Sequence, residues 1–93
     1  MDKEIRWEYS MNFIVEENRI CLKNEESKIV AEIDFEKIKE DTYNVYHTFV
    51  DDSLRGQGIA NQLVTLAYEE ITKKRNAKFE ATCEYAKKWM KKI

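Results

Sequence analysis

The chain has 93 residues, of which 43% are hydrophobic, 12% aromatic and 37% charged, and its net charge is −2. This length supports one core, so we expect a single domain over residues 1–93, and the hydrophobic fraction excludes a disordered chain. The small negative charge provides no basic field for nucleic acid or an anionic membrane, so neither is an expected partner.

Four short strands are predicted in the first half of the chain. Residues 12–16 and 19–23 are apolar runs separated by two polar residues, which suit a tight turn. Residues 28–35 alternate between apolar and polar side chains, apart from Val30. Residues 42–50 are rich in β-branched and aromatic side chains, which favour strands. The short polar connections favour an antiparallel meander.

The second half of the chain changes to helical spacing. Apolar residues recur at intervals of three or four from residue 58 to residue 75, which predicts an amphipathic helix. Basic residues 73–75 suit the negative end of its dipole, and Asn76 suits a left-handed cap. Residues 77–83 are predicted as a fifth strand and residues 84–92 as a short closing helix.

The order of these elements predicts a mixed α/β fold. One helix connects the fourth and fifth strands, and a helical crossover joins strands that run parallel. We therefore expect a four-stranded antiparallel meander, then a helix, a parallel fifth strand beside the fourth, and a short C-terminal helix.

Both glycines of the chain lie in one stretch, VDDSLRGQGIA at residues 50–60, and the chain has no proline. The stretch connects the strongest predicted strand to the longest predicted helix. Helix N-terminal amides bind phosphate when glycine lets the backbone approach the ligand closely. A simpler interpretation is that one glycine makes a turn and the other relieves crowding. No Walker A Gly-Lys-Ser/Thr follows, and Asn61 stands where the dinucleotide fingerprint needs glycine or alanine.

Residues 55–60, RGQGIA, match R/Q-x-x-G-x-G/A, the acetyl-CoA loop of the GCN5-related N-acetyltransferases. The setting narrows the resemblance. HTFV at residues 47–50 before the loop, with Cys83 and Tyr85 after the fifth strand, resembles the small single-domain subfamily marked by a conserved glycine and cysteine. The resemblance covers roughly residues 12–93.

This resemblance implies an acyl-CoA N-acyltransferase fold, with acetyl-CoA in a cleft where the fourth and fifth strands splay apart. Backbone groups of Phe49 and Val50 would pair with the pantetheine chain, and Arg55 would support the phosphates or the loop. The amides that would hold the pyrophosphate are those of Gly56, Gln57, Gly58, Ile59 and Ala60. Residues 1–11 have no counterpart in the family, and we expect them to form a loosely ordered extension.

Cys83 is the candidate nucleophile. It is predicted to end the fifth strand just before the closing helix, and a helix N-terminus raises the thiolate fraction of a cysteine. The resemblance implies that this thiol lies near the acetyl group and takes it as a thioester before passing it to an amine. The wider superfamily uses direct attack by the amine, often with a tyrosine or serine that protonates the departing thiolate. The alternative is a buried small apolar residue, the common state of free cysteine.

His47 and Tyr85 are the other candidate catalytic residues. His47 is the only histidine and matches the subfamily's histidine, with a structural hydrogen-bonding role as the alternative. Tyr85 is interpreted either as the acid that protonates the CoA thiolate or as a packing residue. Glu84 would oppose a thiolate at Cys83 or act as a base toward an incoming ammonium. No ligand cluster accompanies the acidic pair at residues 51–52, so we expect no metal.

The leading hypothesis is an N-acetyltransferase that moves acetyl from acetyl-CoA, its cosubstrate, to an unidentified amine. Residues 16–19 leave no room for the helices that form the acceptor site in larger members. The acceptor is then a macromolecule, or a second subunit completes the site, or the protein no longer transfers. The alternative function is a CoA-binding or interaction module with little turnover, and a third reading is a domain without a ligand. We expect a monomer or a weak dimer.

Composition also indicates the compartment. The N-terminal MDKEIRWEYSMNF lacks the apolar stretch of a secretory signal, and no apolar run approaches the roughly 20 residues that span a bilayer. Cys21 and Cys83 are widely spaced, which favours free thiols over a disulfide framework. These features predict a cytoplasmic protein.

Overall fold

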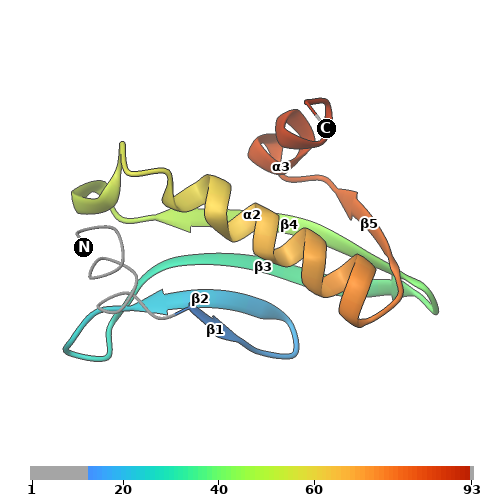
Figure 1. The fold of residues 1–93 in the computed structure, drawn as a ribbon, viewed down its shortest axis with the longest axis horizontal. Helices are drawn as coiled ribbons and strands as arrows, with labels where there is room; N and C mark the ends of the chain where they lie inside the picture. The colour runs from blue at the N-terminus through green and yellow to red at the C-terminus, as the bar shows by residue number, and fades with distance from the viewer. Residues whose placement is uncertain (1–12, 93) are drawn as a thin grey trace, which may run out of the picture.

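The computed structural model describes residues 13–92, and Figure 1 shows a twisted sheet with one long helix lying across it. The strands are β1 (Phe13–Val15), β2 (Arg19–Lys23), β3 (Ile29–Lys39), β4 (Thr42–Val50) and β5 (Lys78–Ala81). The remaining elements are the 3-10 turn η1 (Asp52–Leu54), helix α2 (Ile59–Glu69), the π-helical turn η2 (Glu70–Lys74) and helix α3 (Glu84–Met90). The extension expected over residues 1–11 lies outside the described residues.

The five strands form one sheet in the order β1-β2-β3-β4-β5. Strands β1 to β4 pair antiparallel with their neighbours, and β5 pairs parallel with β4. The predicted mixed α/β fold, the meander and the parallel fifth strand are therefore confirmed. Across residues 13–92, no helix is both long enough and apolar enough to cross a bilayer.

The core lies between α2 and one face of the sheet. Ala31, Ile33 and Phe35 of β3 point to this face, because alternate residues of a strand share a face, and all three are fully buried. The buried stripe of α2 consists of Ile59, Leu63, Val64 and Ala67. Each large aliphatic side chain buried here contributes about 1.5–3 kcal/mol relative to exposure, so this interface dominates the stability of the fold.

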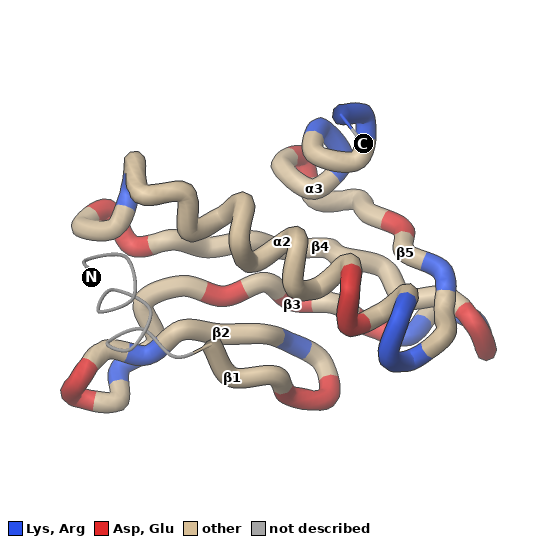
Figure 2. Tube along the Cα trace, in the orientation of Figure 1, with Lys and Arg blue, Asp and Glu red and all other residues tan. Residues whose placement is uncertain are grey.

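Strand β3 is longer than its sequence pattern predicts. It runs to Lys39, whereas the alternating pattern ends at residue 35, and residues 36–40 are exposed. Main-chain pairing with β4 carries the strand outward, since Glu36 pairs with Asn44 and Lys37 with Tyr43. Figure 2 shows charged residues along this projecting hairpin. Because residues 36–40 bury neither face, the sequence here lacks the apolar alternation that predicts a strand.

A bulge in β4 changes which of its side chains face α2. Phe35 of β3 pairs with Val45, but the neighbouring Asp34 pairs with His47, so Tyr46 is an extra residue without a partner in the register. Regular alternation from Val45 would send His47 toward α2. Instead, Thr48 faces α2, because the bulge shifts the alternation by one position.

The C-terminal end of the long helix corrects the sequence prediction in two ways. The predicted α-helix over residues 58–75 is α-helical only to Glu69 and continues as the π-helical turn η2. Arg75 does not serve the helix dipole from the surface, because its side chain is only 19% exposed. Asn76 has a φ of 55°, which confirms the predicted left-handed cap.

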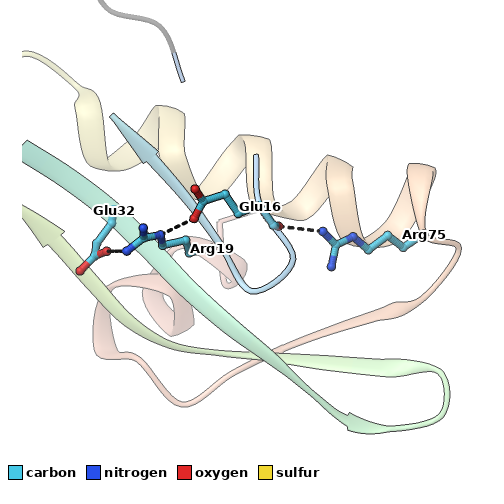
Figure 3. A network of polar contacts seen from close by, with 4 residues as sticks. All are labelled: Glu16, Arg19, Glu32 and Arg75. Atoms are coloured by element: carbon cyan, nitrogen blue, oxygen red, sulfur yellow. Dashed lines mark hydrogen bonds and ion pairs between the residues drawn. The ribbon is translucent and has the colours of Figure 1, made fainter. Parts of the chain in front are cut away.

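Arg75 fastens the β1–β2 turn to the body of the protein (Figure 3). Its Nη2 donates to the carbonyl oxygen of Glu16 at 3.0 Å, and its Nη1 donates to that of Glu17 at 2.9 Å. Its Nε donates to Glu70 Oε2 at 3.0 Å, and the guanidinium lies 5.3 and 5.2 Å from the centroids of two core aromatic rings. One side chain therefore holds the β1–β2 turn against the core of the protein.

An aromatic cluster fixes α3 against α2. Tyr68 of α2 lies 5.3 Å from Phe79 of β5 and 5.5 Å from Trp89 of α3, measured between ring centroids. The indole Nε1 of Trp89 also donates to Oδ1 of Asn61 at 3.0 Å. Because Asn61 lies in the first turn of α2 and Tyr68 in its last, Trp89 fixes α3 along most of that helix.

Candidate active site

The loop between β4 and α2 has the backbone conformation that glycine permits. Gly56 has a φ of 85° and Gly58 a φ of 75°, values that other residues adopt only with strain. A Cβ added at either position would meet no protein atom within 4 Å. Crowding by the protein therefore does not explain these glycines, and the space beside them is left open.

Helix α2 begins with an uncapped N-terminus that faces this space. Gly58 is its N-cap, and no side chain caps it. Its first helical hydrogen bond runs from the amide of Gln62 to the carbonyl of Gly58 at 3.1 Å, so the amides at residues 59–61 have no acceptor within the helix. Unpaired amides and the positive end of the dipole make such a terminus favourable for an anion.

A hollow of about 380 Å³ lies over this loop and the adjacent edge of β4. We call it the glycine-loop hollow. It is lined by Thr48, Val50, Leu54, Arg55, Gly56, Gly58, Ile59, Ala60, Asn61 and Tyr85. Among the predicted cofactor-binding residues, Val50, Arg55, both glycines, Ile59 and Ala60 thus meet in one place. The size and the open backbone suit an elongated phosphate-containing ligand better than a compact one.

Cys83 is held at the edge of this hollow by its own backbone. Its amide donates to the carbonyl oxygen of Val45 at 3.1 Å, and the amide of Thr82 donates to the same oxygen at 2.9 Å. The Sγ atom of Cys83 lies 3.3 Å from Oγ1 of Thr48, which lines the hollow. Cys83 is partly buried and is the N-cap residue of α3, while Tyr85, two residues onward, is 39% exposed on the hollow wall.

The other cysteine has a different setting. Cys21 is fully buried in β2, and burial is the main cause that raises the pKa of its thiol. Neither cysteine forms a disulfide, as predicted. Cys21 therefore serves as an internal control for experiments on Cys83.

His47 does not join Cys83 and Tyr85. It pairs across the strands with Asp34, on the face of the sheet away from α2. There, ligand-type atoms of Glu32, Asp34 and His47 lie within 4.8 Å of one another, and Arg19 Nη1 lies 3.4 Å from Glu32 Oε1. Burial and the nearby Glu32 raise the pKa of Asp34, which His47 and Arg19 partly oppose. The positive charge of Arg19 therefore already compensates part of the negative charge of Glu32 and Asp34.

These acidic residues belong to a second hollow of about 480 Å³, which we call the acidic hollow. It is lined by Glu16, Glu17, Asn18, Arg19, Glu32, Asp34 and Tyr46. The turn that Arg75 fastens forms one wall, and the ion pairs from Arg19 to Glu16 and Glu32 cross it (Figure 3). The sequence analysis found no acceptor pocket, and this cavity appears only once β1 to β4 are assembled.

Two predicted cofactor-binding residues, Phe49 and Gln57, are not among the residues that line the glycine-loop hollow. Phe49 pairs with Glu32, so its side chain lies on the face away from α2 and is 40% exposed, although its backbone belongs to the same strand edge as Val50. Arg55 lines the glycine-loop hollow and pairs with Asp52 at 2.9 Å, with both side chains largely exposed. An exposed pair of this kind contributes about 0–1 kcal/mol, so the guanidinium is available to another anion.

Thr48 is the residue that sequence reasoning missed. It stands between His47 and Phe49, both of which were candidates, yet it is the one that contacts Cys83. A reader of the sequence who continued the alternation from Val45 would choose His47. The bulge is visible only in the pairing of β3 with β4, where the register shifts between Asp34 and Phe35.

An antiparallel meander, a glycine loop at the start of a crossover helix and a parallel fifth strand define the acetyltransferase class of α/β proteins. The family model described as GCN5-related N-acetyl-transferase matches residues 19–93. The chain therefore belongs to the GCN5-related N-acetyltransferase family, whose members transfer acetyl groups and generally use acetyl-CoA as the cosubstrate. No curated protein sequence matches the chain significantly.

Solved structures share this fold. A GCN5-like protein from Staphylococcus aureus, determined by NMR, has 29% identity and a TM-score of 0.72, covering 89% of this chain and 80% of that one. Ribosomal-protein-alanine N-acetyltransferase from Brucella melitensis biovar Abortus 2308 has 20% identity and a TM-score of 0.64, covering 81% and 58%. An acetyltransferase from Bacillus cereus ATCC 14579 has 22% identity and a TM-score of 0.61, covering 94% and 69%. The last two similarities concern the fold alone.

Proposed function

We propose that the protein binds acetyl-CoA in the glycine-loop hollow and transfers its acetyl group to an amine by way of Cys83. One observation carries the proposal. The Sγ atom of Cys83 lies 3.3 Å from the hydroxyl of Thr48, and Thr48 lines the same hollow as Gly56 and Gly58. The candidate nucleophile thus contacts the wall of the hollow that the uncapped N-terminus of α2 faces, in a member of an acetyltransferase family.

The hollow suits the donor in three parts. The amides at the start of α2 and the charge of Arg55 suit the pyrophosphate. Beyond Val45, where pairing of β4 with β5 ends, the edge of β4 suits an extended pantetheine through the backbone of Phe49 and Val50. Cys83 stands where β5 leaves β4, so the thioester would arrive beside its sulfur.

The proposed reaction has two steps that balance. The Cys83 thiolate attacks the acetyl carbonyl, the new C–S bond forms, and the bond to the CoA sulfur breaks. The departing CoA thiolate takes a proton, and Tyr85 on the hollow wall is the proposed donor. A neutral amine then attacks the acetyl-cysteine, the C–N bond forms, the C–S bond breaks to release the Cys83 thiolate, and the amine's surplus proton returns to the Tyr85 phenolate.

A second candidate function is a CoA-binding module that stores acetyl on Cys83 with little turnover. The placement of His47 favours it, because the imidazole lies on the face away from α2 and is not available to Cys83 as a base. Both functions produce an acetyl-cysteine. They differ in whether an added amine discharges that thioester catalytically.

Intact mass spectrometry after incubation with acetyl-CoA tests the proposal. Wild type and Cys21→Ala should each gain one acetyl group, whereas Cys83→Ser should gain none. An amine that removes the group and regenerates the thiol over many cycles supports transfer, and a stable acetyl-protein supports storage. An unmodified wild type that still binds CoA in native mass spectrometry would exclude the cysteine intermediate.

Substitutions of Gly58 test the donor site separately. Valine and asparagine both place a Cβ in the open space, so each should weaken CoA binding at least about tenfold. Asparagine tolerates a positive φ and valine does not, so only Gly58→Val should also lose about 1–2 kcal/mol of unfolding free energy. Calorimetric CoA binding by either variant at wild-type strength would contradict a phosphate site at this loop.

A further inference from the structure

We propose that Thr48 is the positioning residue of Cys83: its hydroxyl orients the sulfur toward the glycine-loop hollow and donates a hydrogen bond to the thiolate. This inference rests on the proposed function, because it concerns the same sulfur. It assigns a role to a side chain that neither the acetyl-CoA loop nor the cysteine itself identifies.

The geometry comes from the bulge in β4. Thr48 pairs with Ile33, a fully buried residue on the α2 face, so its side chain lies on that face too. If Tyr46 paired with Asp34 in regular register, His47 would occupy this side instead. The bulge therefore places a hydroxyl, and not an imidazole, next to Cys83.

Backbone hydrogen bonds hold the Cys83 sulfur and the Thr48 hydroxyl near each other. The amides of Thr82 and Cys83 both donate to the carbonyl oxygen of Val45, at 2.9 and 3.1 Å. This pins the start of α3 to β4 three residues before Thr48. The Sγ–Oγ1 distance of 3.3 Å is within hydrogen-bond range for sulfur, and the pair is partly buried.

The chemistry needs a group that serves both states of the sulfur. A threonine hydroxyl accepts a hydrogen bond from the thiol and donates one to the thiolate by rotating about its C–O bond. Donation to the charged form stabilises the nucleophile before attack, in partly buried surroundings where water does so less well. Glu84, the next residue to Cys83, is an acid whose charge opposes the thiolate, which makes a compensating donor useful.

The test compares Thr48→Val, which keeps the shape and removes the hydroxyl, with Thr48→Ser, which keeps the hydroxyl. The first readout is the rate of Cys83 alkylation by iodoacetamide at fixed pH without acetyl-CoA, in a Cys21→Ala background. We expect Thr48→Val to slow it about three- to tenfold, because fewer thiolates form while each becomes more nucleophilic. Thr48→Ser should restore the wild-type rate.

Thr72→Val is the matched control, because it removes a hydroxyl that donates to the carbonyl of Tyr68 on the helix. It should leave the alkylation rate unchanged. Equal rates for Thr48→Val and wild type would overturn the inference, as would an equal loss in Thr48→Ser. If valine impairs folding, Thr48→Ala against Thr48→Ser isolates the hydroxyl in smaller side chains.

The second readout separates this inference from the proposed function. The rate of acetyl transfer from acetyl-CoA to Cys83 should follow the same order as alkylation across the variants. If alkylation follows that order but no variant and no wild type is acetylated, Thr48 positions the thiol and the proposed reaction is wrong. If acetylation occurs and is indifferent to the hydroxyl, the reaction stands and the inference fails.

Discussion

From the bulge onward, the two faces of β4 carry different chemistry. On the α2 face, Thr48 and Val50 line the glycine-loop hollow beside Cys83. On the other face, His47 and Phe49 pair with the acidic residues of β3. The register shift at Tyr46 separates these outcomes, because regular pairing from Val45 onward would reverse both faces. The comparison teaches that the residue types of a strand do not decide which of them meet a ligand.

Deleting Tyr46 together with His47 should break this comparison most strongly. Thr48 would then follow Val45 directly, so regular alternation sends Thr48 away from α2 and Phe49 toward it. The misplaced Phe49 ring should lower the free energy of unfolding by about 3 kcal/mol, and acetylation of Cys83 should be lost. Urea denaturation measures the first effect and intact mass the second.

Deletion of Tyr46 alone is the control, because His47 then follows Val45 and Thr48 stays on the α2 face. It should cost much less stability and should preserve acetylation. A two-residue deletion that behaves like the single deletion would show that alternation along β4 does not set the two faces.

Arg75→Lys should weaken the attachment of the β1–β2 turn and leave the surroundings of Cys83 unchanged. Lysine keeps the charge but lacks the planar fork that reaches the carbonyls of Glu16 and Glu17. We expect a loss of about 1–3 kcal/mol in unfolding free energy, because the partly buried carbonyl of Glu16 and the exposed carbonyl of Glu17 lose their donors. Lys74→Ala, at an exposed neighbour, should change stability little. Alkylation of Cys83 should stay at the wild-type rate, and a marked decrease would mean that the two ends are coupled.

Asp34→Asn should have the smallest effect and a defined sign. Burial and Glu32 raise the pKa of Asp34 in the folded protein, so the folded state holds this proton more tightly than the unfolded state does. Stability contributed by Asp34 is therefore present below its unfolded pKa of about 4 and is lost as the pH rises through the folded pKa. Asparagine removes that loss.

Unfolding in urea at a series of pH values measures this effect. The variant should be more stable than wild type at neutral pH, with the difference shrinking as the pH falls toward about 4. A constant difference across the range would show that the carboxyl of Asp34 does not titrate differently in the two states.

Much of the fold follows from local patterns in the sequence. Period-two alternation at residues 28–35 and helical spacing from residue 59 onward predicted the sheet, the crossover helix and the parallel fifth strand. The polar half of β3 escaped prediction because pairing with β4 extends it without burying a face. The π-helical turn escaped because its cause is tertiary: Arg75 bonds to the β1–β2 turn.

The candidate site divides in the same way. The glycine loop was readable because positive φ at Gly56 and Gly58 restricts the residue type locally. Cys83 was readable through the family resemblance. The choice between His47 and Thr48 was not readable, because it depends on where β3 and β4 lose register.

The sequence by itself determined the order of strands and helices, the glycine loop before the long helix and the presence of one thiol near the end of the fifth strand. Propensity, periodicity and backbone sterics act within a few residues, so the sequence carries them directly. Only the tertiary structure decided that Thr48 meets Cys83, that His47 faces the acids of β3, and that Arg75 closes the β1–β2 turn. Each of these depends on contacts between residues far apart in the chain, which the packing of the whole sheet and its helix sets together.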